Sequence, residues 1–62
     1  MSNPYVIFVG SEKDNMQPFD TAATEKAAIE RAIQLKDVFQ FTEVVFMPED
    51  DIDTNEVVYS DR

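Results

Sequence analysis

A single amphipathic segment, residues 21–37, most constrains how this chain can fold. Its apolar residues recur at the spacing of one helical face, and neither Gly nor Pro interrupts it. Alanines on that face would let a helix approach a sheet closely, while Ile29, Ile33 and Leu35 would supply apolar area. The face comprises Ala28, Ile29, Ala32, Ile33 and Leu35, and Phe39 joins it if the helix continues. The pattern therefore predicts one helix that covers one face of a sheet.

The ends of this helix are less sharply marked than its middle. Asp20, Thr21 and Thr24 could each accept a hydrogen bond from a free amide of the first turn. We take Thr21 as the predicted N-cap, and we expect the helix to end near Asp37 or Val38.

The segments on either side of the helix have the composition of β-strands. Residues 5–9, 42–47 and 56–60 are rich in β-branched and aromatic side chains. Residues 16–19 could form a short additional strand, and Pro18 would place it at a sheet edge because proline has no amide to donate.

These elements predict a single α+β domain over residues 1–62, with the order β(β)αββ. It is a two-layer sandwich of one helix on a three- or four-stranded, mainly antiparallel sheet. If the short second strand forms, the order 2-1-3-4 makes every neighbour antiparallel. If it does not form, strands one and three run parallel through a right-handed crossover.

The predicted strands are apolar on both faces, although only one helix is available to cover them. Either twist and loops hide the second face, or that face meets a partner, of which a homodimer is the simplest form. The residues predicted to make such contacts are Tyr5, Ile7, Val58 and Tyr59.

Charge is strongly negative and unevenly distributed. The formal net charge is -8, from thirteen acids and five bases, and residues 37–62 hold eight of the acids but only one base. Such a chain repels nucleic acid and acidic membranes and attracts basic protein surfaces. The residues predicted to bind a partner are Glu43, Glu49, Asp50, Asp51, Asp53, Glu56 and Asp61.

Catalytic and metal-binding chemistry have little support in this composition. The chain has no His, no Cys and one Gly, so the usual general base, thiolate, transition-metal ligands and phosphate-binding loop are missing. Residues 51–55 match the start of a calcium loop, but Glu56 stands where glycine is required and Arg62 where glutamate is. We therefore expect a non-enzymatic protein without metal or cofactor.

The compartment predicted from the sequence is the cytoplasm of a bacterial host. Without cysteine there is no sign of an oxidising environment. The longest apolar run, residues 5–9, is too short to cross a membrane.

In size, charge and lack of Cys and His, the chain resembles small acidic proteins of bacteriophages and other mobile elements, among them anti-CRISPR proteins and inhibitors of host polymerases or restriction enzymes. The entry Phe19-Asp20-Thr21 into Glu25–Ala32 contributes to this likeness. The resemblance implies an inhibitor that mimics nucleic acid and blocks a nucleic-acid-binding protein such as a CRISPR effector or polymerase. The alternative is a small structural or regulatory subunit that homodimerises through its sheet, with acidity serving solubility.

Overall fold

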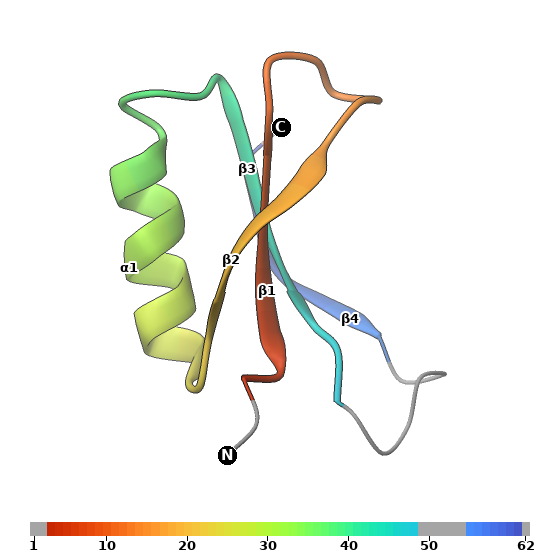
Figure 1. The fold of residues 1–62 in the computed structure, drawn as a ribbon, viewed down its shortest axis with the longest axis vertical. Coiled ribbons are helices and arrows are strands. Elements are labelled where there is room, and N and C mark those ends of the chain that lie inside the picture. Colours follow the sequence, from red (N-terminus) through yellow and green to blue (C-terminus); the bar gives the residue numbers. More distant parts are fainter. Residues whose placement is uncertain (1–2, 49–54, 62) are drawn as a thin grey trace.

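The protein is one helix packed on a four-stranded antiparallel sheet, as seen in a computed structural model that describes residues 3–48 and 55–61 (Figure 1). The strand order is β2-β1-β3-β4, and each neighbouring pair is antiparallel. This confirms the predicted α+β class and, of the two predicted topologies, the one in which the second strand forms. The elements are β1 (Tyr5–Gly10), β2 (Gln17–Ala22), α1 (Glu25–Leu35), β3 (Phe41–Phe46) and β4 (Glu56–Asp61).

The edge strand β2 lies close to its predicted position but extends further toward the helix. It begins at Gln17 and ends at Ala22, and Pro18 lies on this edge strand, the position in a sheet where proline is tolerated. Between β1 and β2, Gly10 must remain small, since a Cβ there would lie 2.7 Å from the Asn15 carbonyl oxygen. This close approach accounts for glycine at the end of β1.

The helix begins at a later residue than the sequence predicted. Thr24 is the N-cap, with extended backbone angles, and its hydroxyl accepts a hydrogen bond from the Ala27 amide at 3.2 Å. The prediction of Thr21 was wrong because Thr21 belongs to β2, where its hydroxyl accepts from the Asn3 side chain. At the other end Lys36 is the C-cap, so the helix also ends before Asp37.

The core lies between α1 and the central strands, and it is small. On the helix, Ala28, Ala32 and Leu35 are buried, which confirms the predicted close approach through alanine. Ile33 was expected in this face but is 54% exposed. It lies more than a quarter turn around the helix from the alanine stripe that meets the sheet. The buried apolar side chains are Ile7, Val9, Ala28, Ala32, Leu35 and Val44.

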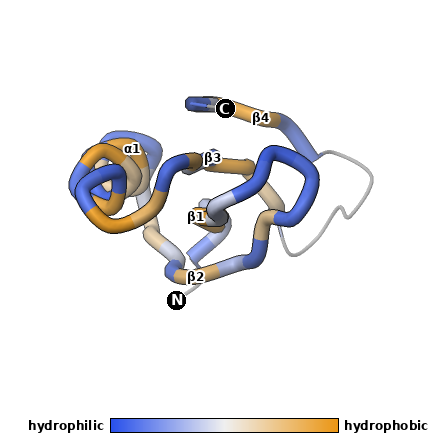
Figure 2. The backbone as a smooth tube through the Cα atoms, turned by 90° about the horizontal axis from the view of Figure 1, so that it is seen from above, coloured by the Kyte–Doolittle hydropathy of each residue, from blue (hydrophilic) through white to orange (hydrophobic). Residues whose placement is uncertain are grey.

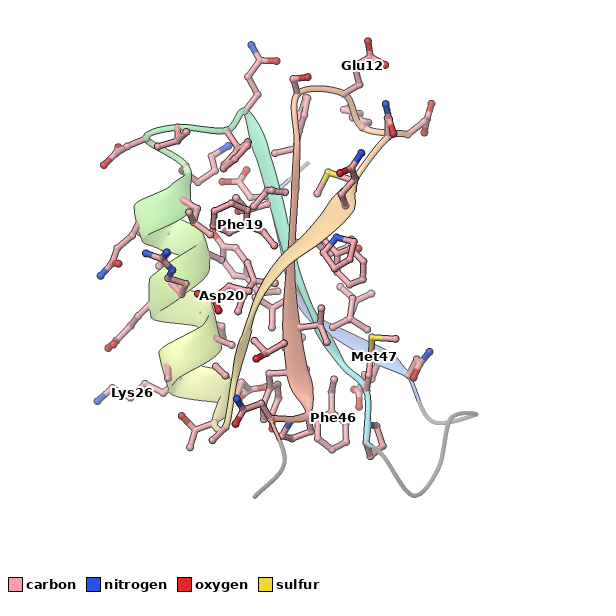
Figure 3. All side chains as sticks on the ribbon, viewed as in Figure 1. Glu12, Phe19, Asp20, Lys26, Phe46 and Met47 are labelled. Atoms are coloured by element: carbon pink, nitrogen blue, oxygen red, sulfur yellow. The ribbon has the colours of Figure 1, made fainter. Side chains whose placement is uncertain are left out.

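One ion pair joins the helix layer to each edge strand. Arg31 Nε lies 3.0 Å from Asp20 Oδ2 of β2, and Figure 3 shows Asp20 between that strand and α1. Lys36 Nζ lies 3.2 Å from Asp61 Oδ2 of β4 and also donates to the Gln40 carbonyl. Because these side chains are partly exposed, each pair contributes only about 0–1 kcal/mol, and burial of the core dominates stability.

The corrected helix start gives a direct test of the capping assignment. We expect Thr24→Ala to lower the free energy of unfolding by about 1 kcal/mol, because the first turn loses its side-chain acceptor. Thr21→Ala, the matched control in β2, should change it by less than about half that amount. Urea unfolding followed by circular dichroism would measure both, and an equal loss in the two variants would contradict the assignment.

Thr42 is the buried polar residue of the core, and its side chain has no hydrogen-bond partner within the described residues. Replacing its hydroxyl by a methyl group removes an unsatisfied buried oxygen while keeping the shape. We expect Thr42→Val to raise the free energy of unfolding by about 1 kcal/mol. Thr42→Ser keeps the hydroxyl and loses the methyl, so it should be destabilising; a stabilised Ser variant would argue against this explanation.

Candidate binding surface

Successive side chains of the two central strands point to opposite sides of the sheet, so the sheet has one face covered by α1 and one face that α1 does not cover. In β1, Ile7 and Val9 are buried beneath α1, so Val6 and Phe8 point to the opposite side. The register pairs Ile7 with Val44, which places the same division in β3. Figure 2 shows α1 on one side of the sheet and the turn between β1 and β2 projecting on the other side.

We call the uncovered side the open face, and its side chains form rows across three strands. Val6, Val45 and Val57 are register partners and form one continuous apolar row. Phe8 and Glu43 pair in the adjacent row, in which the Ser60 hydroxyl donates to Glu43 Oε1 at 3.4 Å. On β1, β3 and β4 the open face consists of Val6, Phe8, Phe41, Glu43, Val45, Val57 and Ser60.

The residues predicted to contact a partner through the sheet lie instead on the helix side. Ile7 is fully buried, so its prediction as a contact residue was wrong. Tyr5 packs against the core and its ring lies 5.0 Å from that of Phe46. Val58 and Tyr59 both pack against the core because the β3–β4 register shifts between them and Val57.

The sequence predicted a second apolar face but not its residues, because β1 is apolar at every position and gives no sign of which side is covered. The sequence of β3 does indicate which of its sides is uncovered, because Glu43 is the single charged side chain of that strand. A carboxylate is excluded from a small apolar core, so its neighbours at two-residue spacing, Phe41 and Val45, must share the uncovered side. The register with β1 then assigns Val6 and Phe8, but only the folded chain provides that register.

The predicted acidic partner-binding residues do not share one face. Glu43 is half-buried on the open face, whereas Asp61 pairs with Thr42 on the helix side and contacts Lys36. Glu56 is exposed at the start of β4, opposite Phe46. The remaining predicted residues, Glu49, Asp50, Asp51 and Asp53, lie outside the described part of the chain.

Basic side chains in the described ranges are distributed differently from these acids. Lys26 and Arg31 lie on α1 and Lys36 caps it, with Lys26 directed away from the sheet in Figure 3. Lys13 lies in the β1–β2 turn between Glu12 and Asp14. Neither β3 nor β4 carries a base of its own, although Lys36 contacts Asp61 of β4.

A pocket of about 350 Å³ lies at the end of the β1–β2 hairpin. Phe19 and Phe39 form part of its wall, with ring centroids 5.4 Å apart in an edge-to-face arrangement. Its lining includes no titratable side chain, so it presents no acid–base group to a ligand. The lining residues are Val9, Gly10, Ser11, Asn15, Gln17, Pro18, Phe19 and Phe39.

Within residues 3–48 and 55–61, no group of three or more acidic side chains is arranged to hold a metal ion. The segment 51–55, with its partial likeness to a calcium loop, lies outside these ranges. The same ranges contain no helix of the length and hydrophobicity needed to span a membrane.

Comparison of the chain with protein-family models, curated proteins and solved structures gave no match. The resemblance to small phage-type inhibitors therefore stays a prediction from the sequence.

Two neighbouring valines test the division of the sheet into faces. Val44 is fully buried under α1, whereas Val45 is half-buried on the open face. We expect Val44→Ala to lower the free energy of unfolding by about 2–3 kcal/mol, through lost apolar contact and a cavity. Val45→Ala should cost less than about 1 kcal/mol. Chemical denaturation would measure both, and a larger loss at Val45 would reverse the assignment of the faces.

Proposed function

We propose that this chain is a non-catalytic binding protein whose partner presents a basic protein surface. The observation that carries this proposal is the separation of charge in the folded chain. β3 and β4 contribute Glu43, Glu56 and Asp61 and no base of their own, and of these acids Asp61 is paired with Lys36 at the end of α1. Long-range attraction from such a surface accelerates association with a cationic partner.

Proteins that handle nucleic acid are the partner class that best fits this charge. Their binding channels carry Lys and Arg that neutralise phosphates, and a formal charge of -8 on 62 residues can compete for those channels. We therefore propose an inhibitor, of the phage type that the sequence resembles, that blocks a CRISPR effector, a polymerase or a similar enzyme. Such a protein acts in the cytoplasm of a bacterial host.

A second candidate function is a subunit that homodimerises through its sheet. The open face favours it, because an apolar row across three strands is the kind of surface that partner chains bury. Charge acts against it, since two copies that each carry -8 repel one another. We therefore place the basic partner first.

The proposed function predicts competition with nucleic acid. A labelled DNA duplex is bound to a panel of purified proteins comprising a bacterial RNA polymerase, a CRISPR effector and a restriction enzyme. At low salt the chain should displace DNA from at least one member, and the effect should weaken by on the order of tenfold or more near ~0.5 M salt.

Two charge-matched variants locate the surface responsible. Reversing Asp50, Asp51 and Glu56 to Lys should abolish displacement, whereas reversing Glu12, Glu25 and Glu30 in the other half changes the net charge equally and should retain most of it. Displacement that depends on net charge alone, with both variants equally weak, would argue against a defined acidic surface. Failure to displace DNA from any member would count against the target class.

A further inference from the structure

The two edges of the sheet differ in how readily another strand can pair with them. We propose that the outer edge of β4 binds an extended, basic segment of another protein, which adds a fifth strand to the sheet. This inference rests on the proposed function, because it names the surface used and the conformation of the partner segment that is recognised.

The edge at β2 is poorly suited to pairing with a further strand. Pro18 has no amide hydrogen to donate, and the Thr21 amide donates to the Asp20 carboxylate at 2.8 Å. Proline on an edge strand is one of the devices by which natural proteins prevent their sheets from pairing with other chains.

The edge at β4 lacks this protection. The strand contains neither proline nor lysine, and its one neighbour in the sheet is β3. Its register with β3 shifts at Val58, but β2 has a comparable shift against β1, so a bulge does not distinguish the two edges. The outer side of β4 therefore presents backbone amides and carbonyls to which a further strand can pair.

Exposed apolar side chains flank the β4 edge on both faces of the sheet. Val57 is 54% exposed on the open face. On the helix side Ile33 is equally exposed, and it lies about 60° around α1 from Lys36, whose side chain contacts β4. The half-buried Tyr59 lies on that side as well. A strand added at β4 can thus bury apolar side chains on both faces while it forms main-chain hydrogen bonds.

Charge argues against a second copy of the chain as the added strand. Opposed residues of an antiparallel pair point to the same side of the sheet. In β4, Glu56 and Asp61 lie on the helix side, whereas Val57 and Ser60 lie on the open face. Pairing the whole strand with a second copy therefore sets Glu56 of each copy opposite Asp61 of the other. Like charges that lie directly opposite destabilise such a pair.

The acids of β4 favour a basic segment instead. Glu56 is exposed and has no ion-pair partner within the described part of the chain. Asp61 contacts Lys36, although its side chain remains 49% exposed. A Lys or Arg opposite Glu56 gains a cross-strand contact with an acid, so Glu56 supplies most of the charge selectivity.

The test uses the full chain and a defined peptide. The probe is a capped ten-residue peptide with alternating Val and Thr at its centre and Lys at both ends. The control peptide has the same sequence with N-methyl groups on two adjacent central residues, which remove donors from both of its edges and leave its charge unchanged. Titrations followed by NMR of the ¹⁵N-labelled chain give the affinities. The unmodified peptide should bind at least about tenfold more tightly than the control.

Amide hydrogen exchange distinguishes an added strand from a contact between side chains. At saturating peptide, alternate amides within residues 56–61 should exchange at least about tenfold more slowly, because they donate to the peptide backbone. The amides of residues 17–22, on the other edge of the sheet, should exchange at an unchanged rate.

Two charge reversals of equal size locate the acid that is recognised. Glu56→Lys places a base on the β4 edge, and Glu12→Lys makes the same change in net charge in the β1–β2 turn (Figure 3). The register puts the two positions at opposite ends of the strands. We expect Glu56→Lys to weaken peptide binding by on the order of fivefold and Glu12→Lys by less than about twofold.

Four results would overturn the inference. The first is equal affinity for the two peptides, and the second is slowed exchange in β2 or in none of the β4 amides. The third is an equal effect of the two charge reversals. The fourth is a dimer of the free chain in sedimentation with β4 amides that are already protected, since the added strand would then be a second copy. The peptide and exchange measurements on the unsubstituted chain keep the test decisive if a variant unfolds.

Failure of this inference can be told apart from failure of the proposed function. In the DNA-displacement experiment, excess unmodified peptide should compete with the target and restore its DNA binding, whereas the N-methylated peptide should not. If the chain displaces DNA and neither peptide reverses the effect, the target class stands and the β4 edge is wrong. If the peptide pairs with β4 but no member of the panel releases its DNA, the β4 edge stands and the nucleic-acid-handling class is wrong.

Discussion

The structure depends on one constraint: a single helix must bury one face of a four-stranded sheet. The helix meets this constraint by packing through Ala28 and Ala32, which have no bulk to hold it away from Ile7 and Val44. Close approach concentrates the apolar area of a short chain into one dry layer. Among the described residues no second helix is present to cover the other face of the sheet.

The polar features of the fold are arranged around that layer. Arg31 and Lys36 connect the helix layer to the two edge strands, and because these side chains are partly exposed each pair adds little to stability. Each pair also engages one acid, Asp20 or Asp61, so the two contacts leave the balance of charge unchanged. Among the acids of β3 and β4, Asp61 is paired with Lys36 and Glu43 accepts a hydrogen bond from Ser60, while Glu56 is exposed at the start of β4.

Sequence reasoning was most accurate where local chemistry decides. The apolar spacing of residues 28–35 and the β-branched runs located the helix and three strands, while Pro18 correctly placed the additional strand at an edge. It was least accurate where competing local signals had equal strength. Thr21 and Thr24 are equally good caps in isolation, and the pairing of Thr21 in β2 with β1 decides between them.

The sequence by itself determined the α+β class, the order of the elements and the excess of acids toward the C-terminal end, because these follow from periodicity and composition. Only the tertiary structure decided which side of each strand is covered. That choice depends on the register between strands distant in the sequence, and a shift of one residue exchanges the two faces. The register buries Ile7 and exposes the row of Val6, Val45 and Val57, so the surface available to a partner is a property of the folded sheet.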